Sequence, residues 1–274
     1  MSIPKPVQSI LRTAWRGVEP SRGVRAIAEE MPVAFSYNRS AYAVMLATPA
    51  DLEDFALGFS LTEGIVRAAR EIEELDIVAG EIGIELRMWL APERAGSITE
   101  RQRRLAGPSG CGLCGLESLE DAVRTPPQVT SGVRFAAAAI HTAMAALPGA
   151  QRLNQLTRAV HAAAFWHPQR GLAALREDVG RHNALDKIIG AAASAGMATG
   201  AGIVLLTSRV SVELVQKTAR LGAPIIAAIS APTALAVRMA DEAGITLAAI
   251  LRGEDFEIFT RPERITGEGR AHEA

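Results

Sequence analysis

The chain of 274 residues contains only two cysteines, and both lie in the segment Gly110-Cys111-Gly112-Leu113-Cys114-Gly115. The neighbouring glycines leave both sulfur atoms unshielded and let the backbone bend toward a partner. Apolar residues with helical spacing follow Cys114, which predicts that the pair lies at a helix N-terminus. The positive end of the helix dipole stabilises a thiolate there. The pattern therefore favours a chemical role for Cys111 and Cys114.

Three kinds of chemistry compete for this cysteine pair. A structural zinc site needs four ligands, and a deaminase-type zinc site needs a His-x-Glu motif, whereas His161 is followed by two alanines. A thioredoxin-like dithiol follows directly after a strand, but the residues before Cys111 are typical of a loop. A persulfide relay needs an accessible thiolate that accepts sulfur from a donor and passes it on, as in thiol–disulfide exchange. The glycine flanks suit this third chemistry.

A dense polar run at 176–183 is the second candidate site. It contains Asp178, Arg181 and His182 between two apolar segments, and Asp186 follows it. A solvated helix face would explain the charges, but the glycine, histidine and asparagine in the run favour a binding pocket. We expect His182 to stay neutral or to act as a donor, and Asp178 or Asp186 to accept from a guanine edge. His161, beside an apolar run, is expected to be a core residue.

Polar residues also follow three predicted strands, at 207–211, 230–233 and 252–255. An open parallel sheet binds ligands beyond the carboxyl ends of its strands, and helix N-termini there favour anions. Ser208 and Arg209 are candidate contacts, because an arginine can hold a phosphate through two hydrogen bonds. The alternative is that Ser211 and Thr233 are helix N-caps and that Arg209 is a surface residue. No Walker loop occurs, and the G-x-G-x-x-G spacing at 110–115 follows a loop rather than a predicted strand, so neither common nucleotide fingerprint applies.

The apolar pattern predicts an α/β fold, because strands buried on both faces alternate with helices and therefore imply a parallel sheet. Thr48 is expected to cap a helix that starts at Pro49 and turns Phe55 and Phe59 toward the core. The predicted strands are 41–46, 77–78, 84–90, 162–165, 172–175, 203–206, 225–229 and 245–251, and the predicted helices after the cysteines are 135–147, 183–189, 211–221 and 233–243.

Bulk composition excludes several classes of protein. The net charge is −1, so no basic field favours nucleic acid. No apolar run approaches the ~20 residues that span a bilayer, and the N-terminus lacks the apolar core of a secretory signal. We therefore expect a cytoplasmic protein without membrane contact. The pattern divides the chain into a leader (1–24), an N-terminal α+β region (25–105), an α/β core (106–265) and a tail (266–274).

Together and in this order, the motifs resemble the formate dehydrogenase accessory sulfurtransferase family (FdhD) over most of the chain. No single motif would be specific. The residues that carry the resemblance are Thr48-Pro49 through Glu63-Gly64-Ile65, Ser109 through Gly115, His161-Ala162-Ala163, Glu177 through Ala184 with Asp186-Lys187, and Ser208 through Ser211 with Glu213 and Gln216-Lys217.

The resemblance implies a sulfurtransferase with a persulfide on Cys111, helped by Cys114. Such a protein takes sulfur from a cysteine desulfurase and passes it to the molybdenum or tungsten bis-molybdopterin guanine dinucleotide cofactor, bound as a substrate, which then enters the formate dehydrogenase catalytic subunit. The alternatives are a cofactor chaperone that transfers no sulfur and a zinc-dependent deaminase. The family's cofactor-binding segment falls on Ile250, Leu251, Arg252, Gly253, Glu254 and Asp255.

The resemblance also implies a homodimer without a tightly held metal. Its fold would be a cytidine-deaminase-like layered sheet with helices on both faces, plus a smaller N-terminal β-containing region. One departure stands out, because the family carries two glycines shortly before His161, where this chain has Arg158 and Ala159. Glycines there would let the backbone approach a ligand closely.

Overall fold

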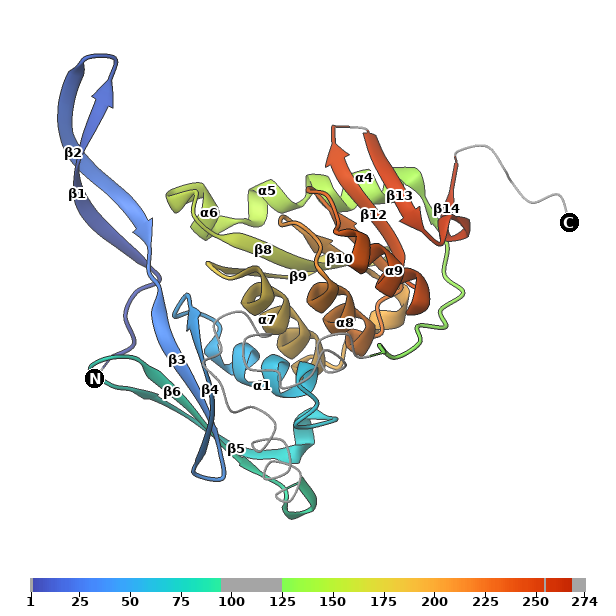
Figure 1. Ribbon diagram of the computed structural model, residues 1–274, viewed down its shortest axis with the longest axis horizontal. Helices are drawn as coiled ribbons and strands as arrows, with labels where there is room; N and C mark the ends of the chain where they lie inside the picture. Colours follow the sequence, from blue (N-terminus) through green and yellow to red (C-terminus); the bar gives the residue numbers. More distant parts are fainter. Residues whose placement is uncertain (1, 95–124, 254, 268–274) are drawn as a thin grey trace, which may run out of the picture.

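The computed structural model of the chain describes residues 2–94, 125–253 and 255–267 (Figure 1). Cys111, Cys114 and Glu254 lie outside these residues, so the roles assigned to them stay predictions. In the described parts of the chain, no helix has both the length and the apolar character that crossing a membrane requires.

A six-stranded sheet forms the centre of the larger part of the molecule, in the order β13-β12-β11-β10-β8-β9. β10, β11 and β12 run parallel and are largely buried, which confirms the alternating pattern read from the sequence. β8 and β9 pair antiparallel at one edge of the sheet, and β13 lies antiparallel to β12 at the other edge. The strands are β8 (His161–His167), β9 (Gly171–Asp178), β10 (Ile203–Leu206), β11 (Ile225–Ala228), β12 (Thr246–Arg252) and β13 (Asp255–Thr260).

Helices cover both faces of this sheet (Figure 1). Leu185, Leu214 and Met239, from α7, α8 and α9, pack into the core on one face, whereas Ile140 of α4 packs on the other. The predicted α/β class with helices on both faces is therefore confirmed, and the likeness to cytidine deaminases stays a prediction. The helices are α4 (Ala137–Ala145), α5 (Leu147–Ala150), α6 (Arg152–Thr157), α7 (Arg181–Ser194), α8 (Val212–Leu221) and α9 (Ala234–Glu242).

A four-stranded sheet in the order β4-β3-β6-β5 forms the N-terminal region. α1 packs on it through two phenylalanines, whose ring centroids lie 5.0 Å (Phe55) and 4.2 Å (Phe59) from that of Phe35. The strands expected at 41–46, 77–78 and 84–90 are confirmed. These elements are β3 (Met31–Tyr37), β4 (Ser40–Ala47), α1 (Leu52–Thr62), β5 (Ile72–Ala79) and β6 (Ile84–Leu90).

The predicted start of α1 is wrong. The helix begins at Leu52, after Asp51 in a left-handed conformation with φ of 53°. Thr48 lies outside the helix, because its hydrogen-bonding groups are used elsewhere. Its N–H donates to Asp178 Oδ2 at 3.0 Å, and its hydroxyl oxygen accepts from the Val179 N–H at 3.1 Å. A contact with a distant part of the chain has overridden a local capping pattern.

α1 and α7 cross in close backbone contact, and this contact joins the N-terminal region to the core. A Cβ atom on Gly58 would overlap the carbonyl oxygen of Asp186, and one on Gly190 would overlap that of Asp54. No side chain fits at either position, so the packing of the two helices requires glycine at both.

The segment predicted as a leader contributes most of a β-hairpin that projects from the body of the molecule (Figure 1). The hairpin consists of β1 (Val7–Arg16) and β2 (Glu19–Ala28). Leu11 and Trp15 are 84% and 68% exposed. The sequence shows no alternation of apolar and polar residues here, because a ribbon that is exposed to solvent on both faces needs no apolar face.

Two further boundaries differ from the prediction. Phe135–Ala136 forms β7, which pairs with β14 (Ile265–Thr266), so that the helix expected from 135 begins at Ala137. α7 continues to Ser194, beyond the predicted end at 189, through a run of alanines that favour helix. Three short 3₁₀ helices complete the described chain, at η1 (Ala69–Glu71), η2 (Thr199–Ala201) and η3 (Pro262–Arg264).

Candidate functional site at the edge of the central sheet

The loops that follow β10 and β11 meet beyond the C-terminal ends of these strands, as the parallel order of the strands predicted. We call this end of the central sheet the sheet edge. Val210 and Pro232 form an isolated β-bridge, and the Thr233 N–H donates to the Val210 carbonyl at 2.9 Å. Thr233 also caps α9, because its hydroxyl oxygen accepts from the Ala236 N–H at 3.2 Å. Thr233 therefore takes the capping role that its sequence position allowed.

Ser208 and Arg209 lie at this edge directly after β10. Ser208 is buried, and its hydroxyl donates to the Arg209 carbonyl at 3.0 Å, whereas the Arg209 side chain is exposed. Ser211 is the N-cap of α8 by position, but its side chain makes no capping hydrogen bond. An exposed guanidinium beside the free N–H groups of a helix can hold an anion.

His161 also belongs to this edge, which corrects its assignment to the core. It begins β8, pairs with Asp178 of β9 and is only partly buried. Burial and the nearby Arg181 lower the pKa of His161, so its imidazole is neutral at pH 7. A lone histidine beside alanines is typical of a core position, and only its place in a family motif pointed elsewhere.

Four buried polar atoms gather where α7 and α8 begin. They are Arg181 Nε, His182 Nε2, Ser211 Oγ and Glu213 Oε2, and none has a hydrogen-bond partner among the described residues. His182 Nε2 lies 3.8 Å from Glu213 Oε2, which is too long for a hydrogen bond. Because buried polar groups nearly always have partners, these atoms indicate a place for a polar ligand or for water.

Glu213 is a residue that our site prediction missed. Burial raises the pKa of Glu213, but the nearby His182 and Ser211 and the N–H groups at the start of α8 outweigh it and lower that pKa to about 2. The carboxylate therefore stays ionised at any physiological pH. A glutamate in the first turn of a helix is a common stabilising feature, so its position alone gave no functional signal.

Asp178, a predicted cofactor contact, is fully buried and bound by the protein itself. Oδ1 accepts from the Gly180 N–H at 2.8 Å and from Asn183 Nδ2 at 2.9 Å. Oδ2 accepts from the Thr48 N–H at 3.0 Å and from the buried Lys187 Nζ at 2.6 Å. These four donors occupy the carboxylate, so a guanine contact at Asp178 stays a prediction without geometric support. In the structure, Asp178 fixes the start of α7.

Asp186, the alternative guanine contact, lies in a second buried network. Its Oδ1 accepts from the Thr62 hydroxyl and from Lys217 Nζ, both at 2.7 Å. These contacts join α1, α7 and α8. The family motifs that contain Asp186, Lys187 and Lys217 therefore serve, in large part, to hold the N-terminal region on the core.

The predicted cofactor segment lies where β12 passes into β13. Arg252, Gly253 and Asp255 are exposed there. Ile250 has φ of 58°, which is rare for a β-branched residue, and a register shift between β12 and β13 accompanies it. β11 separates this segment from the end of β10, a distance of roughly 10 Å at normal strand spacing. Strained backbone of this kind is concentrated at ligand sites.

Arg158 lies in the stretch where the family carries glycines. It adopts a left-handed conformation with φ of 57° at the end of α6, and its N–H donates to the Asn154 carbonyl at 2.9 Å. Glycine reaches this conformation without strain. The backbone conformation at Arg158 is therefore one that a glycine would also adopt, and Arg158 adds a side chain there.

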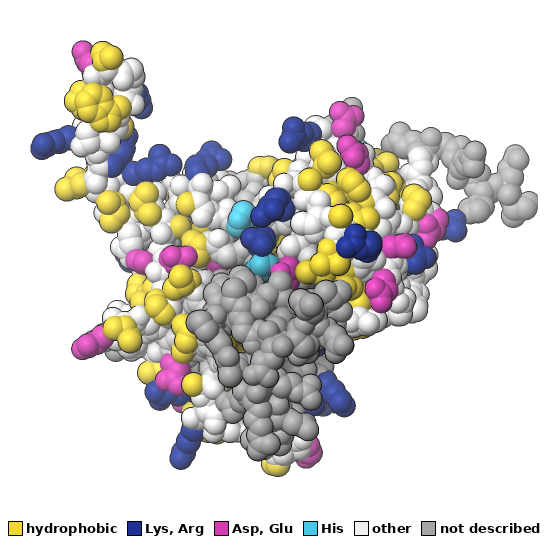
Figure 2. Space-filling view, viewed as in Figure 1, with side chains coloured by type: hydrophobic (Ala, Val, Ile, Leu, Met, Phe, Trp, Pro, Cys, Tyr) yellow, Lys and Arg dark blue, Asp and Glu magenta, His cyan; other side chains and the backbone are white. Residues whose placement is uncertain are grey.

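In the described parts of the chain, no group of three or more His, Cys, Asp or Glu side chains could hold a metal ion. Cys111 and Cys114 lie outside those parts, so the zinc alternative is untested for them. Figure 2 shows histidine side chains at the middle of the visible face, with Lys, Arg, Asp and Glu side chains beside them.

Comparison with known proteins agrees with the motifs. The sequence profile of the FdhD/NarQ family matches residues 28–266. A protein of Agrobacterium fabrum named sulfur carrier protein FdhD is 53% identical over 97% of this chain and 98% of its own length. A protein of the same name from Cupriavidus necator is 49% identical over 93% of this chain and 88% of its own length.

A solved structure gives the same result. The crystal structure of a protein described as a formate dehydrogenase accessory protein, from Desulfotalea psychrophila, superimposes with a TM-score of 0.73 at 26% identity. The match covers 95% of this chain and 99% of that one. These findings confirm the resemblance drawn from the motifs, and the chain belongs to the FdhD/NarQ family.

Proposed function

We propose that this protein is a persulfide sulfurtransferase that serves formate dehydrogenase. Cys111 would accept sulfur from a cysteine desulfurase, and the acceptor would be the molybdenum or tungsten bis-molybdopterin guanine dinucleotide cofactor. The observation that carries the proposal is the Gly-Cys-Gly-Leu-Cys-Gly motif in a chain whose relatives are named sulfur carrier proteins. The proposal includes a homodimer in the cytoplasm and a cytidine-deaminase-like core.

The chemistry needs one thiolate and no external oxidant. The Cys111 thiolate attacks the terminal sulfur of a donor persulfide, the donor S–S bond breaks, and the donor leaves as a thiolate. The acceptor then takes the terminal sulfur of the Cys111 persulfide, that S–S bond breaks, and Cys111 leaves as a thiolate; where the sulfur ends as sulfide, a thiol reductant supplies the two electrons by forming a disulfide. Cys114 would tune the reactivity of Cys111 or resolve its persulfide.

The sheet edge supports the binding half of this proposal. Arg209 is exposed beside the start of α8, and Arg181 and His182 carry buried nitrogen atoms that no described residue satisfies. A dinucleotide cofactor carries phosphate charges, which such groups bind. The strained turn at Ile250 supports a ligand contact at the neighbouring strand end.

Sulfur transfer is tested with radiolabelled cysteine and a cysteine desulfurase. Label should appear on the wild-type protein and then on the cofactor, and Cys111→Ala should prevent both steps and abolish formate dehydrogenase maturation. Cys114→Ala, the matched control, should have a milder effect. Label that never reaches the cofactor would favour the chaperone, and full maturation by Cys111→Ala would refute the proposal. About one tightly bound zinc per chain would instead favour the deaminase.

Nucleotide binding is tested by calorimetry with GDP and ADP. GDP, which has the guanine and phosphates of one cofactor tail, should bind more tightly than ADP. Arg209→Ala should weaken GDP binding by about 1–3 kcal/mol, the usual loss for a charged hydrogen bond. Arg238→Ala removes an exposed arginine from α9 and should leave binding unchanged. Equal binding of GDP and ADP would remove the guanine specificity.

A further inference from the structure

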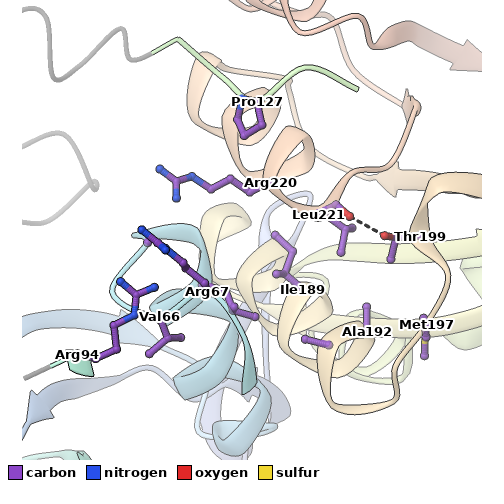
Figure 3. Close-up of a pocket in the computed structure, with 13 residues that line it drawn as sticks. Val66, Arg67, Arg94, Pro127, Ile189, Ala192, Met197, Thr199, Arg220 and Leu221 are labelled. Atoms are coloured by element: carbon purple, nitrogen blue, oxygen red, sulfur yellow. Dashed lines mark hydrogen bonds between the residues drawn. The ribbon is translucent and has the colours of Figure 1, made fainter. Parts of the chain in front are cut away.

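A cavity of about 700 Å³ opens beside the C-terminal half of α7, whereas Arg181 and His182 lie at the N-terminal end of that helix (Figure 3). Its apolar wall includes Val66, Ile189 and Ala192, which are buried. The volume lies within the range of about 300–1,000 Å³ that is usual for small-molecule sites. The cavity is therefore large enough for a ligand and separate from the sheet edge.

Three arginines from three segments line this cavity. Figure 3 shows Arg67, Arg94 and Arg220 on one side of it. Glu71 holds two of them in place, because its Oε2 accepts from the Arg67 N–H at 2.7 Å and from Arg94 Nε at 2.8 Å. No described residue forms a hydrogen bond to the guanidinium group of Arg67, whose side chain is exposed. Among the described residues, the guanidinium group of Arg67 is therefore open to a ligand.

The pairing of an apolar wall with guanidinium groups specifies the chemistry of a ligand. A guanidinium group binds phosphate through parallel hydrogen bonds and stacks on planar rings. The aliphatic side chains of Ile189 and Val66 offer apolar contact to the flat face of a ring. A charged peptide would leave this wall unused, and an uncharged ring would leave the arginines unused.

The cavity lies beside the two points at which the described chain stops and resumes, at Arg94 and near Pro127. Arg94 and Pro127 both line it, and residues 95–124, which include Cys111 and Cys114, connect these two parts of the chain. Both attachment points of the cysteine-bearing segment therefore lie close to the cavity. A ligand bound there would contact the chain where that segment begins and ends.

We propose that this cavity is a second ligand site, which takes a small phosphorylated heterocycle. Arg67 binds the phosphate, and the wall of Val66, Ile189 and Ala192 contacts the ring. The site is independent of the guanine-dinucleotide contacts at the sheet edge, so a ligand can occupy either site alone.

The test measures binding of FMN and of riboflavin, which differ by one phosphate, through fluorescence anisotropy with the full chain. FMN should bind at least about tenfold more tightly than riboflavin, because the phosphate adds charge-assisted hydrogen bonds. Arg67→Ala should remove most of that difference and leave riboflavin binding unchanged. Arg70→Ala is the matched control, because Arg70 is also exposed and lies outside the cavity lining.

Two further variants test the wall and the location. Ala193→Phe places a ring in the cavity and should abolish binding of both flavins, whereas Ser194→Phe, on the exposed side of α7, should not. Circular dichroism checks the fold of each variant. If Ala193→Phe unfolds, the comparison of Arg67→Ala with Arg70→Ala still tests the proposal. Arg209→Ala should leave FMN binding unchanged.

Several results would overturn the proposal. They are equal affinities for FMN and riboflavin, equal effects of Arg67→Ala and Arg70→Ala, loss of FMN binding in Arg209→Ala, or no FMN binding at millimolar concentrations. Because each readout is binding without sulfur, none of them depends on the outcome of the sulfur-transfer assay.

Discussion

Replacing Lys187 with methionine should be among the most destabilising single changes in this protein. Lys187 and Asp178 are both fully buried, and Nζ lies 2.6 Å from Oδ2. Methionine keeps the length and apolar character of the lysine stem but removes the charge. The variant would leave Asp178 as a buried carboxylate without its cation and would leave the Thr48 carbonyl, which accepts from Nζ at 2.9 Å, without this donor.

The expected loss in free energy of unfolding follows from the burial of the ion pair. Removing one partner of a buried ion pair costs about 3–5 kcal/mol, because the remaining charge stays out of water. Three backbone and side-chain donors still reach Asp178, which places the expectation at the lower end of that range. With a urea m-value near the top of the usual range of 1–3 kcal/mol per molar, the unfolding midpoint should fall by about 1–2 M.

The assay is urea unfolding followed by circular dichroism at pH 7. Arg87→Met provides the control, because the Arg87–Glu85 pair is similarly short, at 2.8 Å, but lies at the surface. Its midpoint should not change measurably, since exposed ion pairs contribute little. Equal midpoints for Lys187→Met and the wild type, at equal m-values, would refute the view that the buried pair stabilises the fold.

Three other outcomes follow from geometry and pKa. Gly58→Ala should lower the free energy of unfolding by about 1–3 kcal/mol or more in the same assay, because the new Cβ overlaps backbone on α7. Gly149→Ala is the control, because open space surrounds Gly149, and it should leave the free energy of unfolding unchanged. The pKa of His161, followed by NMR, should rise in Arg181→Gln, since burial and that positive charge lower it; an unchanged pKa would contradict this reasoning. Because the pKa of Glu213 is lowered, its carboxylate contributes stability that is present above the unfolded pKa of about 4.3 and is lost as pH falls toward about 2. Glu213→Gln should therefore weaken the pH dependence of the free energy of unfolding across that window. A pH profile identical to that of the wild type would contradict this reasoning.

The central sheet could be predicted from sequence because its signals are local. Ile203–Leu206 is an apolar run between polar turns, and Gly222 ends α8 in a left-handed conformation with φ of 78°. Such signals need no knowledge of the rest of the chain. Thr48 shows the opposite case, because the residue that decides its conformation is Asp178, and no pattern near Thr48 reveals that partner.

The candidate site could be predicted only in part, for a similar reason. The polar run at 176–183 was identified as a candidate site, but the sequence does not say which of its charges point inward. A buried Asp178–Lys187 pair and a solvated one have the same spacing, and only packing separates them. The arginine-lined cavity was not predicted at all, because Arg67, Arg94 and Arg220 come from three segments and form no motif.

The contact between Thr48 and Asp178 also bears on how the protein is made. These residues lie 130 positions apart, so the N-terminal region cannot complete its packing until Asp178 has left the ribosome. At about 5–20 residues per second, translation of that interval takes roughly 7–26 s. Throughout that time α1 lacks the helix that covers Gly58, which leaves an apolar surface open to a chaperone or to aggregation. Slowing translation after residue 62 should therefore lower the yield of folded protein more than slowing it after residue 194.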